Sequence, residues 1–293
     1  MYTRSHCLSG MHVVERPGLP ALRDRPGISE DVRIVPTVRV NDIRMYYEIH
    51  GEGEPLVMIQ GLGVEISSIV REPGRARYLD RVADRYRVIL FDFRGIGRTE
   101  QPDTPYSIEM FARDAVGLMD ALGIRRAHIM GTSMGSMVAQ EIAARYPDRV
   151  NGLVLVVGFT RVLLRPRAIG LIAMTIPGVR ERMTGWIFKQ PYPPSGASFR
   201  RMLRAGNTYD SRSLLERIVA PTLIVNGTRD ALVPMSITRE LAGGIPGSRL
   251  VLVEGDHLFA ATDPDLLLVP ALAFLREVDG NAGPEATLAA PPS

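Results

Sequence analysis

A serine stands between two glycines in the run Gly131-Thr132-Ser133-Met134-Gly135. The run joins a short apolar segment, typical of a buried strand, to a segment whose apolar residues have helical spacing. Glycines two positions before and after a serine allow a sharp turn, which lifts the hydroxyl above the strand end and places a helix N-terminus behind it. The pattern also occurs in ordinary glycine-rich turns, but this junction favours a nucleophile. We therefore expect Ser133 to be a catalytic nucleophile.

A serine hydroxyl is a weak nucleophile at neutral pH and needs a general base within hydrogen-bond reach. The chain has five histidines. His6 and His12 lie in the irregular N-terminal stretch, His50 follows an early strand, and His128 lies inside the strand before the serine, where a structural role is expected. His257 follows the last predicted strand, in a loop that can reach over the sheet edge. Position and elimination both favour His257 as the base.

The histidine needs a carboxylate that holds its tautomer and stabilises its protonated form. Asp230 follows the strand that precedes the histidine loop, which gives the chain order Ser133, Asp230, His257 expected for acyl transfer on a strand–helix architecture. The strand before that one ends without an acidic residue. Glu254 and Asp256 are too close to the histidine in sequence to orient it. Asp230 is therefore the expected third member.

A tetrahedral intermediate also needs hydrogen-bond donors for its negatively charged oxygen. The backbone N–H of Met134, directly after the nucleophile, is one expected donor. The other is expected in the loop Gly61-Leu62-Gly63, which follows a buried strand, and we nominate the N–H of Leu62. A glycine-rich turn after a strand is also common for purely structural reasons.

Alternating strands and helices must position these residues. The predicted strands cover residues 37–40, 43–49, 56–60, 88–91, 127–130, 153–157, 222–225 and 250–253. Helical spacing is strongest over residues 108–122, 134–146 and 266–278. Such alternation predicts an α/β fold with a mostly parallel, doubly wound sheet.

The alternation of strands and helices stops after the sixth predicted strand, where a small helical cap is expected to be inserted over the sheet. Its helical fragments are expected at 168–176, 180–188 and 199–205. The predicted organisation is a poorly ordered extension over 1–35, a core of 36–157 and 217–279, a cap over 158–216 and a flexible tail over 280–293.

Composition excludes several classes of function. The net charge is +3 and the pI about 9.2, but the arginines are scattered without interleaved aromatic residues, so no nucleic-acid partner is expected. No apolar run reaches the roughly 18–20 residues of a membrane helix, and no signal peptide is recognisable. A single cysteine allows no intrachain disulfide. We expect a cytoplasmic protein with a small-molecule substrate, no membrane partner, and no metal or cofactor; the oligomeric state is not predicted.

Residues from about 40 to 278 resemble the α/β-hydrolase superfamily, especially its esterases, lactonases and C–C hydrolases with a small helical cap. The matching segments are Gln60-Gly61-Leu62-Gly63, Asp92-Phe93-Arg94-Gly95-Ile96-Gly97-Arg98-Thr99, the serine turn, Asn226-Gly227-Thr228-Arg229-Asp230 and Gly255-Asp256-His257. The resemblance implies the same triad and oxyanion donors, and an architectural role for residues 92–99. The chain departs from the pattern at Gln60, where histidine is common, and at Thr132, where a larger residue is frequent.

The expected substrate is a small, mainly apolar carboxylic ester or lactone, hydrolysed through an acyl-enzyme. The pocket is expected to be lined by Gln60, Gly61, Thr132, Phe159, Trp186, Leu232 and Leu258. Alternatives on the same triad are C–C bond hydrolysis and acyl transfer, and a non-catalytic small-molecule-binding protein is a further alternative. A serine at the turn argues against haloalkane dehalogenases and epoxide hydrolases, which need a carboxylate nucleophile.

Overall fold

The computed structural model describes residues 37–70, 73–162, 185 and 187–280. Several sequence-based expectations lie outside these residues. They are the extension over 1–35, the helical fragment at 168–176, most of the fragment at 180–188, Trp186, and the tail after residue 280. All eight predicted strands and the three strongest helices fall within the described part of the chain.

Eight strands form one sheet in the order β1-β2-β4-β3-β5-β6-β7-β8. β1 pairs antiparallel with β2, and β2 pairs antiparallel with β4, whereas every pair from β4 to β8 is parallel. The strands are β1 (Thr37–Val40), β2 (Ile43–His50), β3 (Glu54–Ile59), β4 (Tyr86–Phe91), β5 (Ala127–Thr132), β6 (Val150–Val156), β7 (Thr222–Gly227) and β8 (Arg249–Val253). Each overlaps its predicted range, so the mostly parallel sheet is confirmed.

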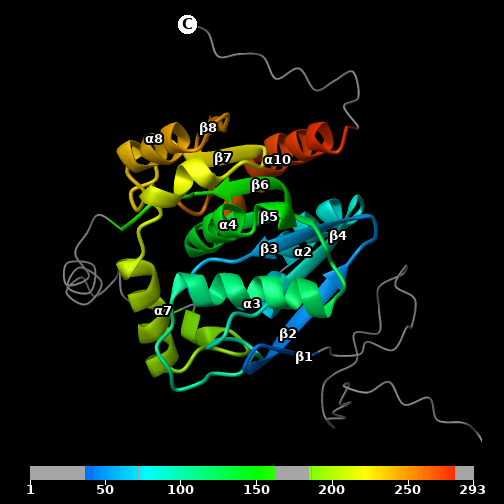
Figure 1. Cartoon of the computed structure of the whole chain (residues 1–293), viewed down its shortest axis with the longest axis vertical. Helices are drawn as coiled ribbons and strands as arrows, with labels where there is room; N and C mark the ends of the chain where they lie inside the picture. The colour runs from blue at the N-terminus through cyan, green and yellow to red at the C-terminus, as the bar shows by residue number, and fades with distance from the viewer. Residues whose placement is uncertain (1–36, 71–72, 163–184, 186, 281–293) are drawn as a thin grey trace, which may run out of the picture.

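Alternating side chains of the strands form two hydrophobic layers. In β3, Val57 and Ile59 pack into one layer and Leu56 and Met58 into the other, and all four are buried. Helices cover both layers (Figure 1). One face carries α3 (Ile108–Ala121), α4 (Met134–Arg145) and α8 (Met235–Gly244); the other carries α2 (Pro73–Ala83), α9 (Phe259–Thr262) and α10 (Asp265–Val278). Strands buried on both faces account for the continuous apolar runs in the sequence.

Several elements of the core have no counterpart among the helical ranges predicted above. They include α1 (Ser67–Val70), α2 and the 3-10 helix η1 (Pro147–Arg149). α1 and η1 are too short to give a periodic signal. α2 is polar overall, and in its last six residues only Leu79 and Val82 are buried. Its low content of large apolar residues explains why the sequence alone did not mark it as a helix.

The described part of the insertion after β6 consists of η2 (Ile187–Lys189), α7 (Gly196–Thr208) and η3 (Arg212–Arg217). α7 contains the predicted fragment at 199–205, and its N-cap Ser195 accepts a hydrogen bond from the Ser198 N–H at 3.1 Å. The two ends of the insertion lie side by side, because Arg161 and Asp210 form an antiparallel bridge and the Ser211 N–H donates to Thr160. The insertion therefore leaves and re-enters the core at one place.

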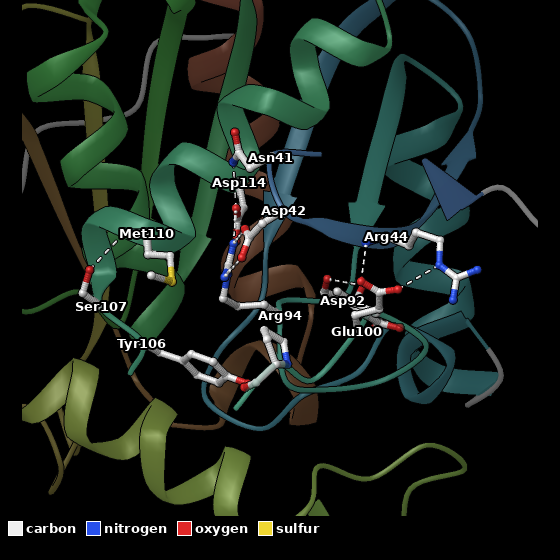
Figure 2. A network of polar contacts seen from close by, with 12 residues as sticks. Asn41, Asp42, Arg44, Asp92, Arg94, Glu100, Tyr106, Ser107, Met110 and Asp114 are labelled. Atoms are coloured by element: carbon white, nitrogen blue, oxygen red, sulfur yellow. Dashed lines mark hydrogen bonds and ion pairs between the residues drawn. The ribbon is translucent and has the colours of Figure 1, made fainter. Parts of the chain in front are cut away.

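A buried ion pair joins three segments near β1 (Figure 2). The Arg94 guanidinium, which is 2% exposed, donates to both carboxylate oxygens of Asp114 in α3, at 2.6 and 2.8 Å. It also donates to Asp42 at 2.8 Å, and the Asn41 side-chain amide donates to Asp114 at 2.9 Å. The pair fixes the β1–β2 turn and the loop after β4 against α3.

Replacing Asp114 with alanine should reduce the free energy of unfolding by about 3–5 kcal/mol, because it leaves the buried Arg94 guanidinium without its main partner. The exposed pair Arg44–Glu100 provides the control: Arg44→Ala should cost less than about 1 kcal/mol. Urea unfolding of both variants measures the difference. Equal losses of unfolding free energy in the two variants would show that burial does not make the Arg94–Asp114 pair more important for stability than an exposed pair.

Asp92, which follows β4, is fully buried, and its two carboxylate oxygens accept the N–H groups of Ile66 at 2.8 Å and Arg98 at 2.9 Å. Burial raises the pKa of this carboxyl to about 7, and nearby Glu65 adds to the rise, although the two backbone N–H groups oppose it. The unfolded chain releases the proton near pH 3.8, whereas the folded protein holds it to about pH 7. The stabilisation linked to this proton is therefore complete below pH 3.8 and lost as pH rises through 7.

Asp92→Asn removes this titration while keeping the side-chain volume. Between pH 5 and pH 8, the wild-type protein should lose about 1–3 kcal/mol of unfolding free energy relative to the variant. Urea unfolding at a series of pH values gives both curves. Parallel curves would contradict a raised pKa at this position.

Candidate active site

Ser133 lies at the turn from β5 to α4 with φ 54° and ψ −119°, a strained backbone conformation for a residue with a side chain. The turn is tight on both sides. A Cβ on Gly131 would lie 2.3 Å from the carbonyl oxygen of Gly135, and one on Gly135 would lie 2.3 Å from the carbonyl oxygen of Ile59. Only glycine fits at either position, which explains the spacing seen in the sequence.

The side chains of Ser133, His257 and Asp230 form a continuous hydrogen-bonded chain. The Ser133 Oγ lies 3.0 Å from His257 Nε2, and His257 Nδ1 lies 2.8 Å from Asp230 Oδ2. The Asp230 side chain is fully buried and the His257 side chain is 14% exposed. Ser133 and His257 are 124 positions apart in the sequence and still lie within hydrogen-bond distance, as the sequence predicted. Their roles as nucleophile and base, and that of Asp230 as the orienting acid, stay a prediction.

Asp230 is held by its own loop. Its second oxygen, Oδ1, accepts the N–H groups of Leu232 at 2.8 Å and Val233 at 2.9 Å. These bonds fix the carboxylate so that the other oxygen, Oδ2, faces His257. Both oxygens of a buried carboxylate are therefore paired, as burial requires.

The loops after β7 and β8 are locked together. The Thr228 N–H donates to Val253 and the Arg229 N–H donates to Gly255, both at 2.9 Å. A Cβ on Gly227 would lie 2.3 Å from the Gly255 carbonyl oxygen, so the two chains touch directly. This contact holds the loop with Asp230 against the loop with His257.

The segments that carry the two nominated oxyanion donors lie next to Ser133. A Cβ on Gly61 would lie 3.4 Å from Ser133 Cβ, so the loop after β3 passes directly beside the nucleophile. The Val64 N–H donates to the Gly61 carbonyl at 3.3 Å and closes this loop into a turn around Leu62. Met134 is the first residue of α4, where backbone N–H groups have no partner within the helix. The role of Leu62 and Met134 as donors stays a prediction.

The predicted pocket residues fall into three groups. Thr132 precedes Ser133 in the chain and Gly61 lies beside it in space, whereas Gln60 and Phe159 are half-buried in the segments that follow β3 and β6. Leu232 and Leu258, which closely follow Asp230 and His257 in the chain, are 56% and 57% exposed. Trp186 lies outside the described residues. Their contact with a substrate stays a prediction.

Another histidine considered in the sequence, His128, has a structural environment. His128 is buried in β5, where its Nε2 lies 2.8 Å from an Asp279 oxygen at the end of α10, as expected of a structural histidine. Within the described residues, no group of three or more His, Cys, Asp or Glu side chains has an arrangement that could hold a metal ion. In the same part of the chain, no helix is both long and apolar enough to span a bilayer.

Comparison with known proteins adds to this geometry. The profile of one protein family, described as alpha/beta hydrolase fold, matches residues 54–207. A curated protein of Azorhizobium caulinodans named "Putative carbamate hydrolase RutD" is 32% identical, with 84% of this chain and 100% of the relative covered. The enol-lactonase of Burkholderia xenovorans has a TM-score of 0.71 at 27% identity, covering 82% of this chain and 99% of that one. A thermophilic esterase of Thermogutta terrifontis has a TM-score of 0.66 at 25% identity, covering 80% and 94%.

Proposed function

The chain belongs to the alpha/beta-hydrolase family and is a hydrolase, and from this premise we propose that it is a serine hydrolase acting on a small carboxylic ester or lactone. The observation that carries the proposal is the chain of hydrogen bonds from Ser133 Oγ through His257 to Asp230. The first residue of this hydrogen-bonded series, Ser133, has a strained backbone conformation, as expected where a fold holds a reactive group in place.

In the proposed reaction, His257 Nε2 accepts the hydroxyl proton as Ser133 Oγ attacks the substrate carbonyl carbon. The resulting oxyanion is stabilised by the N–H groups of Leu62 and Met134. Protonated His257, stabilised by Asp230, returns the proton to the leaving alcohol, and the acyl group remains on Ser133. Water, deprotonated by the same histidine, then releases the acid and restores the enzyme.

The substrate class is supported by two exposed leucines and by the similar solved structures. Leu232 and Leu258 offer apolar surface in the segments that follow Asp230 and His257, which suits a small apolar acyl or ring substrate. The similar solved structures include an enol-lactonase and an esterase, and both named activities involve a C–O bond next to a carbonyl.

A carbamate is a second candidate substrate. Several curated relatives, at 27% to 32% identity, carry the name "Putative carbamate hydrolase RutD". A carbamate carbonyl can be attacked by the same serine, so the catalytic residues would not change. Measuring kcat/KM for p-nitrophenyl butyrate, γ-butyrolactone and a small N-unsubstituted carbamate decides between the substrate classes. The ratio of two kcat/KM values is the preference of the enzyme for one substrate over the other.

A fluorophosphonate probe tests the proposed nucleophile. The wild-type protein should become labelled at Ser133, as located by peptide mass mapping, and Ser133→Ala should not be labelled. Ser136, a buried serine in the first turn of α4, is the matched control, and Ser136→Ala should label like the wild type. Labelling at another residue, or none, would contradict the proposal.

A further inference from the structure

Gln190 directly follows η2 and precedes α7 in the insertion, and its side chain reaches the loop after β3. Its Nε2 donates to the carbonyl of Gly63 at 2.7 Å and to the carbonyl of Ile187 at 2.8 Å. Its Oε1 accepts the N–H of Glu65 at 3.0 Å. The residue is 8% exposed, so a single buried amide satisfies three backbone groups.

The loop that Gln190 contacts is held very firmly after residue 64. Three consecutive backbone N–H groups donate to side-chain oxygens. The Glu65 N–H donates to Gln190, the Ile66 N–H donates to Asp92, and the Ser67 N–H donates to the Glu65 carboxylate. Gly63, with φ 72°, leaves no free space for a side chain, because a Cβ there would lie 3.0 Å from Ile187. The segment around Gln190 therefore packs directly on this loop.

The contacts continue from Gln190 to the site through two peptide groups. The Gly63 carbonyl, which Gln190 holds, and the Val64 N–H belong to one trans peptide and point in opposite directions. That N–H donates to the Gly61 carbonyl. The Gly61 carbonyl shares its peptide with the Leu62 N–H, which must point the opposite way. Fixing the Gly63 carbonyl thus fixes the direction of the Leu62 N–H.

We infer that Gln190 is a positioning residue that aims the Leu62 N–H at the oxyanion. The inference rests on the proposed function, in which Leu62 is an oxyanion donor. It also links the insertion to the chemistry, because the same Nε2 binds the Ile187 carbonyl of η2. A donor contributes to catalysis only if it is aimed before the reaction, and removal of one such donor lowers kcat by about 10²–10³-fold.

Gln190→Met keeps the approximate length of the side chain and removes all three hydrogen bonds. It should lower kcat for p-nitrophenyl butyrate by about 10–100-fold with KM changed less than about threefold, because the oxyanion forms only in the transition state. The inhibition constant of a trifluoromethyl ketone, which forms a tetrahedral adduct on serine, should rise by a similar factor. Gln190→Glu keeps the acceptor for Glu65 but turns the donor into an acceptor facing two carbonyls, so its kcat should fall at least as far.

Gln140 provides the matched control. It is fully buried, its amide donates to the Phe159 carbonyl at 3.2 Å, and it accepts from the Ser211 hydroxyl at 2.6 Å. Gln140→Met should lower the melting temperature as Gln190→Met does but leave kcat within about threefold.

Either of two results would overturn the inference. One is a Gln190 variant with wild-type kcat and inhibitor affinity; the other is an equal fall in kcat for the Gln140 and Gln190 variants. If Gln190→Met does not fold, Gln190→Glu decides by the same criteria. A rate that depends on Ser133 but not on Gln190 overturns this inference alone, whereas a rate independent of Ser133 overturns the proposed function.

Discussion

Replacing Ser133 with alanine is expected to lower kcat/KM for p-nitrophenyl butyrate by about 10⁴–10⁶-fold, because the proposed acyl-enzyme forms on the Ser133 hydroxyl. The fold should be unaffected by the loss of the hydroxyl, because the strained backbone at this position is imposed by the glycines on either side. Alanine even removes a polar group from the turn. The unfolding free energy of the variant should therefore equal or exceed that of the wild type.

Steady-state kinetics and urea unfolding on the same preparations separate the two effects. Ser136→Ala is again the control, since it removes a buried hydroxyl three residues away and should keep the wild-type rate. If Ser133→Ala retained hydrolysis at the wild-type rate, the ester-hydrolase proposal would fail.

The second large effect is expected at Asp230. In Asp230→Asn the side-chain oxygen should keep the Oδ1 position, where it accepts the N–H groups of Leu232 and Val233. The new NH2 group then faces His257 Nδ1 and donates to it. This arrangement places the remaining imidazole proton on Nε2, so the histidine presents a donor to Ser133 and cannot accept its proton. We expect kcat to fall by about 10⁴-fold with little change in KM.

Asp256→Asn is the control for this change, because it alters the carboxylate next to His257 in sequence. Asp256 is exposed and accepts the Leu258 N–H at 2.8 Å, so its variant should keep kcat within about threefold. Comparable losses in the two variants would indicate a general effect of charge near the histidine and would contradict the specific role of Asp230.

Local sequence signals predicted the sheet and the meeting of Ser133, Asp230 and His257. Buried parallel strands produce short apolar runs, and functional residues in such sheets follow the carboxyl ends of neighbouring strands. The positions of the three residues after β5, β7 and β8 could therefore be read in order along the chain. Helix α2 was missed because its sequence is polar overall and contains few large apolar residues.

Gln190 could not be found in this way. It lies 127 residues from Gly63 in sequence, and a single glutamine in a helical insertion has no pattern that marks it. Its contacts depend on how the insertion returns over the loop after β3, which is a tertiary property. The buried pair Arg94–Asp114 is similar, because a charged residue in α3 reads as an exposed position until the loop after β4 is placed against it.

A crystal structure of the protein after reaction with a phosphonate ester tests the central claim most directly. We predict phosphorus bonded to Ser133 Oγ, with the phosphonyl oxygen within about 2.7–3.1 Å of the backbone nitrogens of Leu62 and Met134. His257 should remain between the adduct and Asp230. A phosphonyl group on a different residue, or a phosphonyl oxygen turned away from both nitrogens, would contradict the account.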